Sequence, residues 1–150
     1  MGYYSIIKAI DDFIKSDGIV NTVTNGDIFS VDLKKRTIFP LAHITVNNAT
    51  IEQSMVSMNV SILFMDTVGI GKASKLNDLD ENTREIDVLN TQLELAKRLI
   101  ASLHRGDLNI DGYEVVSGAT CEPFVERFEN NLAGWAVTFD ALQANDMTIC

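Results

Sequence analysis

The chain has 150 residues, a formal net charge of −9 and a pI near 4.5. This length predicts one domain over residues 1–150 with a sizeable buried core. The acidic balance argues against a protein that reads nucleic acid, because a negative surface repels phosphate backbones. No apolar run is long enough to span a membrane, and residues 1–15 lack the basic start and apolar core of a signal peptide.

The amino-terminal third begins with a predicted helix over residues 3–16, followed by short strands. Asp17 and Gly18 supply the helix stop. Strands are predicted over 20–24 and 28–33, with Asn25-Gly26 as a hairpin turn between them. A further strand, over 42–47, starts after Pro40 and is expected to end at Asn47-Asn48. The apolar stripe of the helix recurs at three- and four-residue spacing and consists of Tyr3, Ile6, Ile7, Ile10, Phe13 and Ile14.

The clearest strand pattern lies in MVSMNVSILFMD, residues 55–66. Alternation places one set of apolar residues on one face and polar residues on the other. Towards the end both faces become apolar, at Leu63 and Met65, which predicts cover on both sides, by a helix and by a neighbouring subunit. The apolar set is Met58, Val60, Ile62 and Phe64, and the polar set is Ser57, Asn59 and Ser61.

A long helix is predicted from Asp80 to a stop at Gly106, with Asn82 or Thr83 as its cap. Two further strands follow, one within 113–128 interrupted at Pro123 and one over 132–142. Alternation in the last strand places Trp135, Val137 and Phe139 on one face and Ala136, Thr138 and Asp140 on the other. Only one long helix interrupts the strands, which favours an α+β fold with a mainly antiparallel sheet, packed on one face by the amino-terminal helix and the long central helix. The predicted core stripe of the central helix is Ile86, Leu89, Leu93, Ala96, Ile100 and Leu103, widened by Val88, Leu95 and Leu99.

The segment DTVGIGKASK, residues 66–75, raises the question of a nucleotide site at Lys72. A phosphate-binding loop of the Walker type requires glycine where Asp66 stands and serine or threonine where Ala73 stands. The dinucleotide pattern fails at Ser74, which occupies the place of the third glycine. We therefore interpret the segment as a connector, with nucleotide binding through Lys72 as the less favoured alternative.

Other chemistry-bearing residues have ordinary structural interpretations. His43 lies in an apolar strand, and His104 lies near a helix end where a cation is favourable. Cys121 is interpreted as a small buried hydrophobe, and two cysteines, with Cys150 as the second, make neither a zinc site nor a disulfide framework. An enzyme using Cys121 with a histidine remains the alternative. We expect no enzymatic activity, cofactor or metal.

Two charged clusters are candidates for other roles. The basic run Lys34-Lys35-Arg36 is interpreted as a solvated turn, with a docking patch for an acidic neighbour as the alternative. The segment EPFVERFEN, residues 122–130, predicts a strand with one acidic and one aromatic face. Its acidic residues are Glu122, Glu126 and Glu129.

The element order resembles that of the tail terminator and tail completion proteins of tailed bacteriophages. FPLAHITVNN (39–48), DVLNTQLELAKRLIASLHRGDL (87–108) and the tract from ATCEPFVERFENNLAGW to the last residue (119–150) are similar to a family of neck or tail proteins. That family occurs in phages of Bacteroidetes hosts, the crAss-like group included. The segment NGDIFSVDLKKRTI (25–38) is an addition to that pattern.

The resemblance implies a structural virion protein, made in the cytoplasm of the host bacterium, that forms a homo-oligomeric ring, a hexamer or a dodecamer. Such a ring joins the portal or connector to the tail, on either side of that joint, and its negative wall lets DNA pass without specific binding. Glu122, Glu126 and Glu129 are the candidates for the lumen lining. The candidate subunit contacts are Lys34, Lys35, Arg36, Gly69, Gly71, Lys72 and Lys75.

Overall fold

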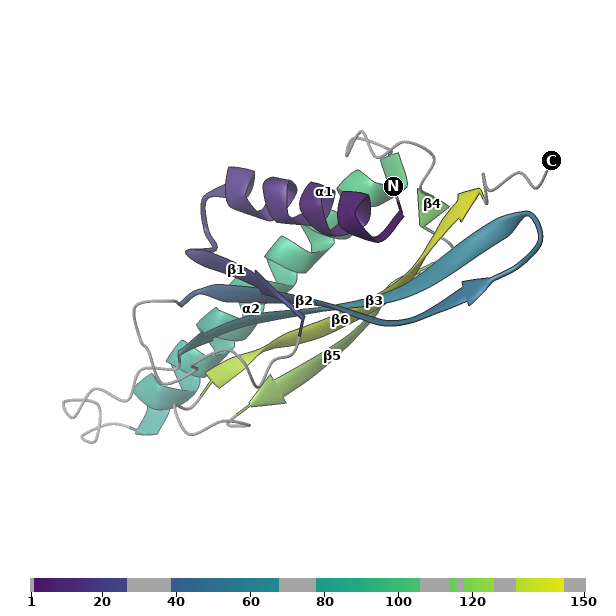
Figure 1. The fold of residues 1–150 in the computed structure, drawn as a ribbon. Coiled ribbons are helices and arrows are strands. Elements are labelled where there is room, and N and C mark those ends of the chain that lie inside the picture. Colours follow the sequence, from purple (N-terminus) through teal and green to yellow (C-terminus); the bar gives the residue numbers. More distant parts are fainter. Residues whose placement is uncertain are drawn as a thin grey trace.

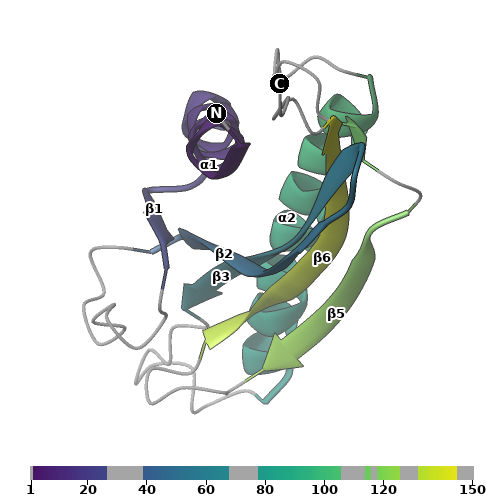
Figure 2. The ribbon, with the colours of Figure 1, turned by 45° about the vertical axis from the view of Figure 1, so that its right-hand side comes forward.

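The computed structural model describes residues 2–26, 39–67, 78–105, 114–115, 118–125 and 132–144. Its helices are α1 (Gly2–Asp17) and α2 (Asp78–Arg105). Its strands are β1 (Thr22–Asn25), β2 (Leu41–Ile51), β3 (Met55–Thr67), β4 (Glu114–Val115), β5 (Thr120–Val125) and β6 (Leu132–Ala144). Both helices lie on the same face of the sheet (Figure 1 and Figure 2). The predicted α+β class, with a mainly antiparallel sheet covered on one face by the two helices, is confirmed.

The described strands form one sheet in the order β1-β2-β3-β6, and both β4 and β5 pair with the outer side of β6. β1 runs parallel to β2, and every other pairing is antiparallel. β3 and β6 form the longest ladder, in unbroken register from Met55 opposite Ala144 to Thr67 opposite Leu132. This central pair fixes which residues share a face across the whole sheet, because side chains directly opposite each other point the same way.

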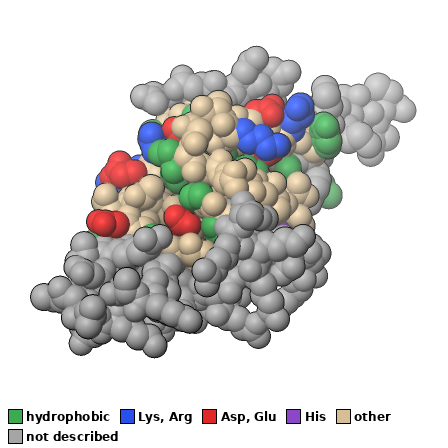
Figure 3. All heavy atoms as spheres, turned by 90° about the vertical axis from the view of Figure 1, so that its left-hand side faces the viewer, with side chains coloured by type: hydrophobic (Ala, Val, Ile, Leu, Met, Phe, Trp, Pro, Cys, Tyr) green, Lys and Arg blue, Asp and Glu red, His purple; other side chains and the backbone are tan. Residues whose placement is uncertain are grey.

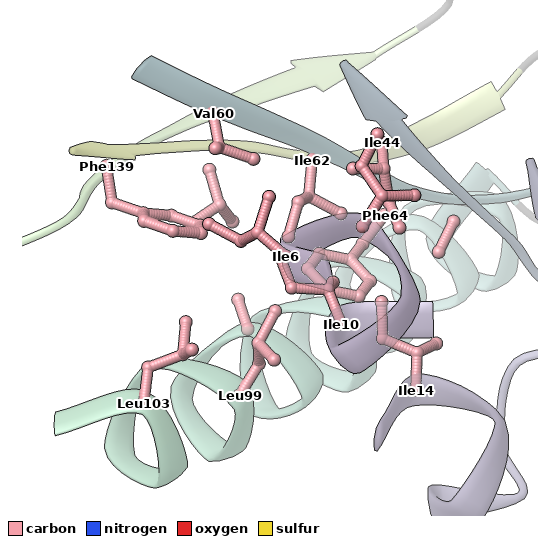
Figure 4. Close-up of a cluster of buried hydrophobic side chains, with 14 of the residues drawn as sticks. Ile6, Ile10, Ile14, Ile44, Val60, Ile62, Phe64, Leu99, Leu103 and Phe139 are labelled. Carbon is pink, nitrogen blue, oxygen red and sulfur yellow. The ribbon is translucent and has the colours of Figure 1, made fainter. Parts of the chain in front are cut away.

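The hydrophobic core lies between the sheet and the two helices (Figure 4). Ile6, Ile10 and Ile14 on α1 confirm the predicted stripe, since each is 2% exposed or less. The predicted stop is also confirmed, because Gly18 adopts φ +79°, which glycine takes without strain. The sheet contributes the alternating apolar set that the sequence predicted for β3, together with residues of β2 and β6. The sheet residues labelled in the core are Ile44, Val60, Ile62, Phe64 and Phe139.

The helix α2 differs from its prediction in two respects. It begins at Asp78, so Asn82 and Thr83 lie inside it and are not caps. Its buried stripe is rotated from the predicted one, because Ile86 is 63% exposed. Val88, Leu95 and Leu99, which were expected only to widen the stripe, form its centre. The helix packs across both β3 and β6, and it turns the side that carries these three residues towards them. The buried residues are Val88, Gln92, Leu95, Ala96, Leu99, Ser102 and Leu103. Neither described helix is long and apolar enough to cross a membrane.

Two strand predictions were wrong in their boundaries. β2 continues past Asn47-Asn48 to Ile51, because a bulge between Val46 and Asn48 absorbs one residue and the ladder with β3 resumes. Pro123 does not interrupt its strand, since it lies within β5, where an edge strand tolerates a missing N–H. The strand predicted over 28–33, and so its hairpin, lies outside the described residues.

Candidate interaction surface

The face of the sheet opposite the helices, here called the open face, carries a different set of side chains. On β3 it presents Ser57, Asn59 and Ser61, as the alternation predicted. On β6 the matching register positions are Thr138 opposite Ser61 and Asp140 opposite Asn59. Polar residues therefore meet across neighbouring strands, where they can bond to one another without losing contact with water.

A chain of hydrogen bonds links these residues across three strands. The Nδ2 of Asn47 donates to Asn59 Oδ1 at 2.8 Å and to Ser61 Oγ at 2.7 Å. The Nδ2 of Asn59 donates to Asp140 Oδ1 at 2.8 Å, and Ser61 Oγ lies 3.0 Å from Thr138 Oγ1. We call these five residues the polar ladder. Alternation along β2 places Asn47 on the open face with His43 and Thr45, and the bulge places Asn48 on the same face beside it, opposite Asn59.

His43 belongs to the same face and is fully buried. Its Nδ1 lies 2.6 Å from Thr24 Oγ1, and its Nε2 lies 2.9 Å from the carbonyl oxygen of Gly26. Because a carbonyl oxygen only accepts, Nε2 carries the hydrogen and Nδ1 accepts from Thr24. The imidazole thus ties the parallel strand β1 to β2, which agrees with the interpretation of His43 as a hydrogen-bonded structural histidine.

One end of the open face is apolar. Phe124 on β5 lies opposite Gly134, which lies opposite Met65, which lies opposite Leu41. Met65 is covered on the open side, as predicted, but the described cover comes from Phe124 of the same chain, and the expected neighbouring subunit stays a prediction. We call this group the end cluster. Its buried members are Phe39, Leu41, Met65, Phe124 and Leu132.

The charges of the described residues divide between the two sides of the molecule. The described Lys and Arg side chains lie on the helices, where they form exposed ion pairs, such as Lys15 with Asp11 at 3.0 Å and Arg98 with Asp17 at 3.2 Å. The described part of the open face carries the carboxylates of Glu122 and Asp140 and no Lys or Arg. Seen from the left of Figure 1, the described surface mixes both signs (Figure 3).

The structure places one of the predicted lumen residues. Glu122 is exposed on the open face, opposite Ala136. The expected separation of acidic and aromatic faces was wrong, because Glu122 and Phe124 are two residues apart in a strand and therefore point the same way. Several predicted site residues lie outside the described part of the chain: Glu126, Glu129, Lys34, Lys35, Arg36, Gly69, Gly71, Lys72 and Lys75.

Cys121 lies on the other side of the sheet from His43. It sits opposite Val137 and packs against the core, whereas His43 is on the open face of β2, with β3 and β6 between them. Burial raises the pKa of the Cys121 thiol, which is the reverse of what activates a cysteine nucleophile. His104 is exposed in the last turns of α2, as predicted. The described residues do not bring Cys121 and His43 into one site.

A shallow groove of about 240 Å³ lies between α1 and the end of β1. Its lining includes Lys8 and Asp11, and each of these is ion-paired along α1, to Asp12 and Lys15. Tyr4 and Asn25 complete its polar lining. Within the described residues, no cluster of His, Cys, Asp and Glu has the grouping of a metal site.

The polar ladder was only half visible in the sequence. The alternation in residues 55–66 predicted that Asn59 and Ser61 share a face, and the pattern in 132–142 did the same for Thr138 and Asp140. The sequence pattern did not predict the register that brings the two strands together, nor the bonds from Asn47. The β3–β6 bonds join residues 77 and 81 positions apart, and those of Asn47 join residues 12 and 14 positions apart.

Comparison with known proteins gives no family for this chain. No protein family model matches it. The curated proteins likewise contain no significant match.

Proposed function

We propose that this chain is a structural subunit of a ring in the neck or tail of a tailed phage, which joins the portal or connector to the tail. In this proposal the open face lines the DNA conduit and the helices face outwards. The proposal starts from the resemblance of the sequence tracts and the element order to tail terminator and neck proteins.

The observation that supports this orientation is the charge of the open face. Its described side chains are neutral or acidic, and the Lys and Arg side chains that the structure describes lie on the helix layer. Duplex DNA is held mainly by cations that neutralise its phosphates. A wall without such cations, carrying Glu122 and Asp140, repels the backbone weakly and lets the duplex slide.

The polar ladder suits the same role. Its amide, hydroxyl and carboxylate groups bond to one another, so they remain fixed in position while the surface stays wet. Along the polar ladder, the open face presents polar groups instead of an apolar patch that would stick to a passing polymer. The buried end cluster stiffens one end of the same face.

The first experiment measures the native mass of the purified protein over a range of concentrations, with electron microscopy of the same samples. We expect closed rings of six or twelve copies, as the resemblance implies. A monomer at every concentration, including in mixtures with portal and tail proteins, would count against the ring.

A second experiment tests the orientation. In assembled rings, Asp140→Lys is expected to create salt-sensitive binding of duplex DNA, because it places a cation where the phosphates pass. The matched control is Asp12→Lys on the exposed side of α1, which makes the same change in charge on the outer surface. Equal DNA binding by both variants would show that the open face does not line the conduit.

A further inference from the structure

The outer edge of β2 changes character at Asn25. β1 covers this edge only as far as Asn25 opposite Ile44, and Gly26 N donates to Ile44 O at 3.1 Å. Beyond that point β2 continues to Ile51, and every residue from Asn47 to Ile51 is exposed. Figure 1 shows the β2–β3 hairpin extending past both helices. Among the described strands, none pairs with this part of the edge.

The direction of the backbone groups along this edge follows from one hydrogen bond in the β2–β3 turn. Glu52 N donates to Met55 O at 2.8 Å, so Glu52 points its backbone towards β3. By alternation Thr50 and Asn48 do the same, and Ala49 and Ile51 direct their N–H and C=O groups outwards. An exposed edge with such outward groups is a template for another strand.

The two edges of the sheet are protected differently. On the far edge, β5 contains Pro123, which has no N–H, and the charged Glu122, and both features discourage an added strand. The segment Asn48–Ile51 contains neither proline nor charge, and its protection is limited to the bulge that precedes it. A strand is therefore more readily added beside β2 than beside β5.

We propose that the Asn48–Ile51 edge of β2 pairs antiparallel with the same edge of a second copy of this chain. Pairing centred on Ala49 places two alanines opposite each other, so no side chains collide. Asn48 then faces Thr50 of the second copy on the open side, as a hydrogen-bonding pair. Across the bulge, Ile51, which is 75% exposed, meets Val46 of the second copy on the helix side.

At this edge, charge does not oppose a second copy as the occupant. The chain carries a net charge of −9, so most contacts between two copies bring acidic groups together. The segment from Thr45 to Ile51 has no charged residue, so two copies meet there without like charges directly opposite. The contact is short, so we expect a weak dimer, with a Kd of about 10–1,000 μM. Raising the salt concentration to about 0.5 M should strengthen it, because salt screens the remaining repulsion.

The test uses the whole chain and two matched variants. Ala49→Lys places two cations opposite each other in the paired edge, and Ala101→Lys makes the same change at an exposed position of α2. Sedimentation measures the dimer against concentration, and amide hydrogen exchange measures protection at Ala49 and Ile51. We expect a dimer and rising protection of these amides in the wild type and in Ala101→Lys, and loss of both in Ala49→Lys.

Two results would overturn the pairing. One is exchange of the Ala49 and Ile51 amides at open-edge rates at every concentration, whether the protein is monomeric or forms a ring. The other is a dimer that persists in Ala49→Lys. The edge pairing does not depend on the proposed phage function. Rings whose Ala49 and Ile51 amides stay unprotected would support the ring and contradict the edge pairing. An edge-paired dimer that forms no rings would support the edge pairing and contradict the ring.

Discussion

One strand, β3, serves two opposite environments, and its two sides differ in how they are stabilised. Towards the helices it presents Val60, Ile62 and Phe64, each 0% exposed. Towards the open face it presents Asn59 and Ser61, which bond to neighbouring strands and remain partly in water. The covered side is stabilised because folding removes apolar surface from water. The open side is stabilised less, because its hydrogen bonds within the protein replace hydrogen bonds to water of similar strength. Substitutions on the two sides should therefore differ several-fold in their effect.

The largest effect is expected at Phe64. Phe64→Ala should lower the free energy of unfolding by about 3–5 kcal/mol, because it leaves a cavity in the fully buried core. The neighbouring substitution Leu63→Ala, on the half-buried open side, should cost about 1–2 kcal/mol. Urea unfolding followed by circular dichroism measures both. If Phe64→Ala does not fold, Phe64→Leu provides a milder comparison, and equal costs at positions 63 and 64 would contradict the difference between the faces.

The next effect concerns the close approach of β3 and β6. A Cβ at Gly134 would lie 1.8 Å from the carbonyl oxygen of Phe64, and that atom belongs to the backbone and cannot turn aside. Gly134→Ala should therefore cost about 3 kcal/mol or more, as overpacking at its upper range does. The control is Gly118→Ala, because a Cβ there meets nothing within 4 Å and its cost should be near zero. Similar melting temperatures for both variants would show that the two strands separate easily at this point.

Gly134 also shows what the sequence could and could not reveal. Periodicity alone predicted both faces of β3 and β6 and the stripe of α1, because each depends on the period of a single element. The order of these elements then predicted the α+β class. A glycine inside a strand was visible, but its cause was not. Glycine is needed at position 134 because the backbone of Phe64 lies close to it, and Phe124 lies opposite it on β5. Both relations depend on the register of three strands.

The errors have the same origin. Ile86 was predicted to be buried from its spacing, yet the angle at which α2 crosses the sheet leaves it exposed. Asn47-Asn48 looked like a strand end, because asparagines favour turns, yet a bulge carries the strand onwards. Sequence periodicity shows that an element is amphipathic. It does not show how the element is oriented against its neighbours or in which register it pairs with them, and the polar ladder depends on that register.

The third prediction concerns a polar residue that is buried on the covered side of the sheet. Gln92 lies on the covered side and is 1% exposed, and among the described residues neither its Nε2 nor its Oε1 has a hydrogen-bond partner. Gln92→Met keeps the length of the side chain and removes both unsatisfied groups, so the protein should gain about 1–3 kcal/mol. Asn90→Met, at an exposed position of the same helix, reports the change in helix propensity alone. A loss of stability in Gln92→Met beyond this control would indicate that an ordered water satisfies the buried amide.

The smallest effect is expected in the polar ladder, where Asn59 accepts from Asn47 and donates to Asp140. Asn59→Ala should cost only about 1 kcal/mol, because water reaches the groups it leaves behind. Asn59→Asp should cost more at neutral pH, since it replaces a donor by a carboxylate next to that of Asp140. Urea unfolding at neutral pH measures both variants. Equal costs of Asn59→Ala and Asn59→Asp would show that position 59 and Asp140 are not neighbours in solution, and the ladder would then lose the link between β3 and β6.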